Sequence, residues 1–131
     1  MQARERRWQT ILADSSKWVR LAVDANGCIG GFVHFGVDRD GGPASVGEVC
    51  SVYVNPEQWG SGCGSVLLAH AFQALFESGF SECTLWVLEG NELARRFYER
   101  EGMAVDGARQ SQMIAGLSVE EIRYRRDLVS P

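Results

Sequence analysis

The chain has 131 residues, 45% of them hydrophobic, and a formal net charge of -4 at pH 7. A chain of this length usually folds as one domain around its own core, so we predict a single domain over residues 1–131. An acidic chain offers no basic surface to nucleic acid, and this favours small molecules or cationic groups as partners.

Four cysteines are spread along the chain without a Cys-x-x-Cys pair, and this spacing predicts neither a zinc site nor a redox dithiol. No apolar run approaches the roughly 18 residues that span a bilayer, and the charged N-terminus lacks the apolar stretch of a signal peptide. We therefore expect a cytoplasmic protein with free thiols, no bound metal and no membrane partner. The cysteines are Cys28, Cys50, Cys63 and Cys83.

The first half of the chain is predicted to contain one helix and three antiparallel strands. Gln2 to Ala13 carries apolar residues at helical spacing among charges, which predicts an amphipathic helix. Val19 to Val23 alternates in polarity, and Asn26-Gly27 is a typical hairpin turn before the apolar run Ile29 to Val37. Ser45 to Asn55 is rich in Val, Tyr and Cys, which predicts the third strand.

Two helices and a buried strand are predicted further along. From Ser65 onwards the apolar residues follow the i, i+3, i+4, i+7 pattern of one buried helix face, and Gly79 ends that helix. Thr84 to Leu88 is apolar almost throughout, as expected of a central strand that is covered on both faces. A second helix begins at Asn91 and runs to about Glu101. The apolar face of the first helix comprises Leu68, Ala71, Phe72, Leu75 and Phe76.

The C-terminal part is predicted to hold two short strands, Ala104-Val105 and Glu121 to Arg126, around a loose polar segment, Ala108 to Ser118. The complete order is a helix, three antiparallel strands and then α-β-α-β. This order predicts an α/β (α+β) fold in which a mixed sheet is flanked by helices on both faces.

A glycine-rich loop, Trp59 to Gly64, joins the third strand to the helix that follows it. Glycines let backbone N–H groups approach an anion closely, and the start of a helix favours a phosphate. The loop lacks the Gly-Lys-Ser/Thr of a Walker loop, and Ser65 stands where a dinucleotide fingerprint needs its third glycine. We expect a pyrophosphate to be held by Trp59, Gly60, Ser61, Gly62, Cys63, Gly64 and Ser65.

Two motifs between Val49 and Met103 resemble those of the GNAT superfamily of N-acetyltransferases. The loop is similar to the family pattern Q/R-x-x-G-x-G/A at Gly62 and Gly64, whereas Trp59 replaces the Gln or Arg. Downstream, Asn91 to Met103 is similar to N-x-x-A-x-x-F-Y-x-x-x-G-F, with Met in place of the last Phe. The resemblance implies a GNAT-like mixed sheet and acetyl-CoA as the cosubstrate.

The resemblance also implies roles for individual residues. In this family acetyl-CoA enters between two splayed strands, its arm pairs with backbone groups that correspond to Val52 and Val54, and an amine attacks the thioester directly. Asn91 is similar to the residue that hydrogen-bonds the pantetheine arm, although Asn also caps helices in its own right. Tyr98 is similar to the tyrosine beside the sulfur, where it would act as general acid. The alternative is a tyrosine that packs between helix and sheet.

Two residues are candidates for the general base. Glu48 occupies the position at which histone-acetylating members of the superfamily carry a glutamate, so it is the leading candidate. The alternatives are a water relay and a carboxylate that only binds a cationic acceptor. His34 is the second candidate because an unperturbed imidazole has a pKa of about 6.5, although a lone strand histidine is more often structural.

The function that the resemblance implies is acetyl transfer from acetyl-CoA to a primary amine of a small molecule, peptide or protein. Family members usually begin with a strand and a helix that help to wall the acceptor pocket, and this chain is expected to lack them. A non-catalytic acyl-CoA binding module is therefore the alternative function, and a loop for another phosphate ligand is a third. An exposed sheet edge would suit a homodimer.

Overall fold

The computed structural model describes residues 8–12, 18–39 and 41–129. In this part of the chain one seven-stranded sheet has the order β1-β2-β3-β4-β5-β7-β6. Neighbouring strands are antiparallel except for β4 and β5, which are parallel, so the sheet is mixed as predicted. The strands are β1 (Gln9–Leu12), β2 (Val19–Val23), β3 (Ile29–Val37), β4 (Val46–Val54), β5 (Glu82–Leu88), β6 (Ala104–Ile114) and β7 (Leu117–Asp127).

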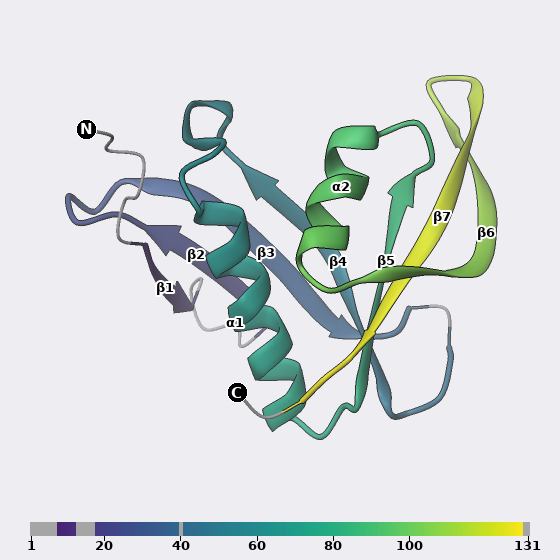
Figure 1. Cartoon of the computed structure of the whole chain (residues 1–131), viewed down its shortest axis with the longest axis horizontal. Helices are drawn as coiled ribbons and strands as arrows, with labels where there is room; N and C mark the ends of the chain where they lie inside the picture. Colours follow the sequence, from purple (N-terminus) through teal and green to yellow (C-terminus); the bar gives the residue numbers. More distant parts are fainter. Residues whose placement is uncertain (1–7, 13–17, 40, 130–131) are drawn as a thin grey trace.

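Two helices, α1 (Cys63–Glu77) and α2 (Glu92–Arg100), lie on the same face of the sheet (Figure 1). A short 3₁₀ turn, η1 (Pro56–Gln58), follows β4. The prediction of helices on both faces is therefore wrong for the described part of the chain. No helix among the described residues is long and apolar enough to cross a membrane.

The predicted N-terminal helix, Gln2 to Ala13, is wrong where the structure describes it. Gln9–Leu12 is the strand β1, which pairs antiparallel with β2. A few apolar residues at helical spacing cannot outweigh the backbone hydrogen bonds that the free edge of β2 offers to an extended segment. The remaining residues of the predicted helix lie outside the described ranges, except for Trp8, which is not helical.

The C-terminal part forms one long hairpin, β6 and β7, and not two short strands around a loose polar segment. Ala115 and Gly116 both have positive φ angles, 52° and 81°, which suits the tight turn between antiparallel strands. Polar cross-strand pairs replace apolar alternation in this hairpin. Gln110 and Gln112 donate to Glu121, and Ser111 donates to Glu120.

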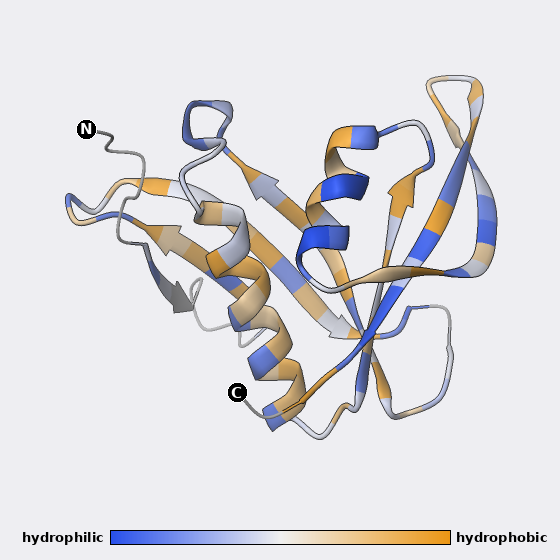
Figure 2. Ribbon diagram, viewed as in Figure 1, coloured by the Kyte–Doolittle hydropathy of each residue, from blue (hydrophilic) through white to orange (hydrophobic). Residues whose placement is uncertain are grey.

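The core forms where α1 lies on the sheet. Figure 2 shows hydrophobic colours along α1 and hydrophilic ones along α2. Most of the predicted apolar face of α1 is buried, but Phe76 is 37% exposed. The helix α2 has no fully buried residue, although Ala94, Phe97 and Tyr98 pack against the core. The buried residues of α1 are Cys63, Leu67, Leu68, Ala71, Phe72 and Leu75.

The central strands separate part-way along the sheet. The parallel pairing of β4 with β5 covers Val46 to Glu48, and Glu48 opposite Thr84 is the last pair. Beyond this pair the two strands diverge (Figure 1). A bulge at Cys50 changes the register of β4 against β3 at the same place. The β5-facing edge of β4 therefore has no strand partner beyond Glu48 among the described residues.

Gly47 allows α1 to approach β4 closely. A Cβ atom at this position would lie 2.8 Å from the Leu75 side chain and 3.2 Å from the backbone oxygen of Gly36. We expect Gly47→Ala to lower the free energy of unfolding by about 1–3 kcal/mol, the usual cost of overpacking a core. Gly90 has nothing within 4 Å of the same atom. Gly90→Ala should change the stability by less than about 0.5 kcal/mol. Urea unfolding of both variants measures the difference, and equal values would contradict the packing argument.

Candidate functional site

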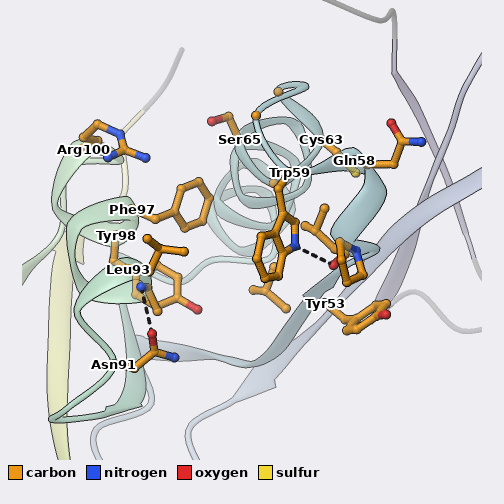
Figure 3. Close-up of a pocket in the computed structure, with 17 residues that line it drawn as sticks. Tyr53, Gln58, Trp59, Cys63, Ser65, Asn91, Leu93, Phe97, Tyr98 and Arg100 are labelled. Carbon is orange, nitrogen blue, oxygen red and sulfur yellow. Dashed lines mark hydrogen bonds between the residues drawn. The ribbon is translucent and has the colours of Figure 1, made fainter. Parts of the chain in front are cut away.

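A cavity of about 600 Å³ lies between β4, the glycine loop, the start of α1 and one side of α2 (Figure 3). Among the sequence-predicted site residues, all but Ser61 and the two candidate bases, Glu48 and His34, line it. Several lining residues were not predicted: Tyr53, Pro56, Gln58, Leu93, Ala94, Phe97 and Arg100.

The glycine loop presents unpaired backbone donors to the cavity. Gly60 and Gly62 have φ angles of 82° and 89°, in the left-handed region that glycine adopts without strain. Gly62 is the N-cap of α1 and supplies no side-chain cap. The first N–H groups of a helix have no partner within the helix, and the helix dipole adds positive potential there. The start of α1 can therefore hold an anion.

Gly64 serves a different purpose, because it brings the two helices together. A Cβ atom here would lie 3.0 Å from Cζ of Phe97 in α2. Ser65, the next residue, donates a hydrogen bond of 2.7 Å to Glu101, just beyond α2. These contacts fix α2 as the wall of the cavity opposite the loop.

Ser61 anchors the loop and does not face the cavity. Its hydroxyl donates to the Gln58 carbonyl oxygen at 2.6 Å and accepts from the indole N–H of Trp8 at 3.2 Å. Trp8 lies over Gly30, where a Cβ atom would be 2.3 Å from the indole ring. Sequence analysis missed this contact because 53 residues separate Trp8 from Ser61. Gly30, one of three glycines in β3, was the available sign of a close approach.

Val52 and Val54 lie on the part of β4 that no longer pairs with β5. The carbonyl oxygen of Val54 accepts a hydrogen bond of 3.0 Å from the indole N–H of Trp59 (Figure 3). Backbone groups of alternate residues in a strand point to the same edge, so Val52 shares the edge of Val54. This edge faces the cavity and can pair with an extended ligand that carries amide groups.

Tyr98 brings a phenol to the cavity. Its ring packs 5.4 Å from that of Phe97 and 6.2 Å from that of Tyr124, measured between centroids. No described residue hydrogen-bonds the Tyr98 hydroxyl, whereas the hydroxyl of Tyr124 is held by Arg95 and Glu99. Burial raises the pKa of Tyr98 above its usual value. The phenol therefore stays protonated at neutral pH and can donate to a ligand.

Asn91 caps α2, as its residue type predicts. Its side-chain oxygen accepts from the backbone N–H of Ala94 at 3.1 Å. The cap uses the oxygen, so the amide nitrogen is the group that can donate to a ligand in the cavity (Figure 3).

Cys63 is buried at the first position of α1, and burial raises its pKa to about 11. All four cysteines are free. No group of His, Cys, Asp and Glu suited to a metal ion occurs among the described residues.

Glu48 is 1% exposed and does not line the cavity. Its Oε1 accepts from the backbone N–H and the Nε of Arg39, both at 3.0 Å, and its Oε2 accepts from Arg39 at 2.7 Å. It occupies the last paired position before β4 and β5 separate. The base role of Glu48 stays a prediction. Arg39 was missed because it lies in a loop without periodicity.

His34, the second candidate base, lies on β3 opposite Ser51 and is exposed. Val33 and Phe35 on either side of it are fully buried in the core beneath α1. Because side chains alternate along a strand, His34 points to the face of the sheet away from the helices. It does not line the cavity, and its base role also stays a prediction.

The comparison with known families agrees with the two motifs and with the fold. The model of the acetyltransferase (GNAT) family matches residues 1–103 of the chain. The chain belongs to the GNAT family. The resemblance predicted from the loop and from the motif that begins at Asn91 is thus confirmed.

Two relatives of this GNAT chain carry acetyltransferase names. The uncharacterized N-acetyltransferase YuaI of Bacillus subtilis (strain 168) is 33% identical over 110 residues, which cover 82% of the chain and 61% of the relative. The mycothiol acetyltransferase of Kocuria rhizophila is 40% identical over 62 residues, 47% of the chain and 20% of that protein. The chain therefore spans less than two thirds of either relative.

Solved structures share the fold. YncA from Salmonella typhimurium, solved with its cofactor acetyl-CoA, has a TM-score of 0.72 at 24% identity and covers 86% of the chain and 65% of its own. Ard1 from Thermoplasma volcanium has a TM-score of 0.73 at 19% identity, over 87% of the chain and 72% of its own. The predicted GNAT-like mixed α/β fold is confirmed.

The Arg39–Glu48 pair is expected to stabilise the point where the central strands separate. Removing the Arg39 side chain leaves a buried carboxylate with one remaining donor, so Arg39→Ala should lower the free energy of unfolding by about 1–3 kcal/mol. Arg96 forms an Arg–Glu pair with Glu92 in which both side chains are more than half exposed, at 66% and 74%. Arg96→Ala should cost less than about 0.5 kcal/mol. Chemical unfolding tests both, and a small loss in Arg39→Ala would show that the pair is not structural.

Proposed function

We propose that this chain binds acetyl-CoA in the cavity between β4, α1 and α2 and transfers the acetyl group to a primary amine. The observation that carries the proposal is that three groups with different tasks line one cavity. They are the uncapped start of α1, the open edge of β4 and the free phenol of Tyr98. The family, the N-acetyltransferase relative and the acetyl-CoA in YncA support the same donor.

Each part of the donor has a matching partner in the cavity. The pyrophosphate is expected at the backbone N–H groups of residues 62–65, where the helix dipole favours negative charge. The pantetheine arm carries two amides, which can pair with the backbone of Val52 and Val54 as an added strand would. Asn91 can donate to the arm from the opposite side. Among the lining residues Arg100 is the one charged side chain, and its sign suits a phosphorylated ligand.

The reaction needs no covalent enzyme intermediate. The lone pair of the amine attacks the thioester carbonyl carbon, the C–S bond breaks, and the sulfur takes a proton from Tyr98. The amine loses a proton to a base, for which Glu48, His34 and a water relay stay open. A backbone N–H on the open edge, such as that of Val52, can stabilise the oxyanion. Tyr98 suits its task because its raised pKa keeps the proton in place until thiolate charge develops.

One observation favours the second candidate, an acyl-CoA binding module without transfer. Glu48 is buried, both of its oxygens are held by Arg39, and it does not line the cavity. If no other base acts, the chain would bind acetyl-CoA without turnover. A thiol-release assay with a panel of amines separates the two functions, because only a transferase releases CoA faster when an amine is added.

The coenzyme site is tested by placing a carboxylate at the start of α1. Gly62→Glu puts negative charge where the pyrophosphate is expected, so calorimetry should show that binding of acetyl-CoA is lost. Gly79→Glu is the matched control, because Gly79 also has a positive φ and open space around it but lies beyond the other end of α1. It should suffer the same backbone strain, about 1 kcal/mol, and keep the native affinity. Equal binding by both variants would contradict the site.

The acid role of Tyr98 is tested with a second cavity tyrosine as control. Tyr98→Phe should lower kcat by about 100-fold or more if the phenol donates the proton. Tyr53→Phe removes the hydroxyl of a half-exposed lining residue and should leave kcat within about twofold. Because burial raises the pKa of Tyr98, the native rate should not fall through ionisation of this phenol below about pH 10. Steady-state rates from pH 6 to 10 check both statements, and similar kcat values for the two variants would rule out the role.

A further inference from the structure

The Trp59 side chain is hydrogen-bonded to a backbone carbonyl of β4 with which the arm of acetyl-CoA is expected to pair. Its indole N–H donates to the carbonyl oxygen of Val54 at 3.0 Å, and the residue lines the cavity. The side chain comes from the loop and reaches back over five residues to the strand that precedes it (Figure 3). An indole N–H and an amide N–H are similar hydrogen-bond donors. Trp59 therefore hydrogen-bonds the Val54 carbonyl oxygen in the way that a ligand amide would.

The hydrogen bond from Trp59 to Val54 matters because it lies on the open edge of β4. Beyond Glu48 the strand has no partner on the β5 side among the described residues, so no strand supplies a donor to the exposed Val54 carbonyl. The indole N–H of Trp59 supplies a donor to this carbonyl. A ligand that inserts along β4 must take over the same carbonyl and displace the ring beside it.

We propose that Trp59 is an internal ligand of Val54 that competes with the amide-bearing arm of the donor. The inference rests on the proposed function, because it assumes that the arm of acetyl-CoA pairs with β4. A ligand with such an arm replaces the Trp59 hydrogen bond when it binds. A ligand that consists of the phosphates and nucleoside alone uses the start of α1 and leaves Trp59 in place.

The local structure allows the ring to move without the loop. The Trp59 side chain is 63% exposed, and the indole makes one hydrogen bond. Its backbone is held by a hydrogen bond of 3.2 Å from its N–H to the Pro56 carbonyl oxygen, with relaxed φ and ψ angles of -63° and 136°. The next part of the loop is fixed by the bond between Trp8 and Ser61. Rotation of one side chain is therefore enough to open the edge of β4.

The test compares two ligands on one conservative variant. Trp59→Phe keeps an aromatic ring but removes the N–H donor, so the arm no longer has to break a bond to enter. One net hydrogen bond corresponds to about a fivefold change in Kd. Calorimetry should therefore show acetyl-CoA binding about three- to tenfold more tightly than to the native chain. Adenosine 3′,5′-bisphosphate carries phosphates but no arm, and its Kd should stay within about twofold.

Trp8→Phe is the matched control, since it removes the other indole N–H that contacts this region. Loss of the Ser61 anchor should loosen the phosphate loop and weaken both ligands together. The proposal is overturned if Trp59→Phe binds acetyl-CoA no more tightly than the native chain, or if it shifts both ligands equally. If neither the native chain nor the variant binds acetyl-CoA, the proposed function itself fails, and the role of Trp59 falls with it. Melting temperatures should match between native and Trp59→Phe, because the side chain is mostly exposed.

Discussion

The separation of β4 from β5 is the constraint on which the rest of the site depends. Parallel pairing ends at Glu48 opposite Thr84, and the backbone groups of β4 beyond it must be satisfied by something other than a strand. Buried or half-buried peptide groups are nearly always hydrogen-bonded in native proteins, so such an edge requires a substitute. Part of that substitute is a side chain, Trp59. The gap between β4 and β5 is thus part of the sheet's own structure, and the bulge at Cys50 lies beside it.

The two helices convert this gap into a cavity with walls of different character. The helix α1 packs its apolar face on the sheet and begins at a loop whose backbone donors face the cavity. The helix α2 lies close to α1 because Gly64 has no side chain. Asn91 at its N-cap and Tyr98 within it line the cavity. One wall therefore can hold phosphate, one edge can pair with amides, and one wall can donate hydrogen bonds from side chains. A single extended ligand with those three kinds of group fits the arrangement better than three separate ones.

The features predicted from sequence were those encoded over short distances along the chain. The hairpin at Asn26-Gly27, the apolar face of α1, the glycine loop and the cap at Asn91 each depend on a few neighbouring residues, and each is present. The strand β1, the hairpin of β6 and β7, the pair of Arg39 with Glu48 and the contact of Trp8 with Ser61 were missed. In these cases the stabilising partner is supplied by another strand or by a loop. The spacing of apolar residues within the segment itself therefore predicted the wrong structure or no structure. Glu48 was located correctly on its strand, but its environment could not be predicted because nothing in the sequence points to Arg39.

The burial of Cys63 has a chemical consequence for the start of α1, where the pyrophosphate is proposed to bind. A thiolate there would bring negative charge to the place where the phosphates are expected, and the ionised form of a cysteine is also its reactive form. Burial raises the pKa of Cys63 to about 11, so at neutral pH the sulfur keeps its proton. A small side chain suits the first turn of α1, and because the thiol stays neutral it does not oppose the positive potential that the helix start offers to an anion.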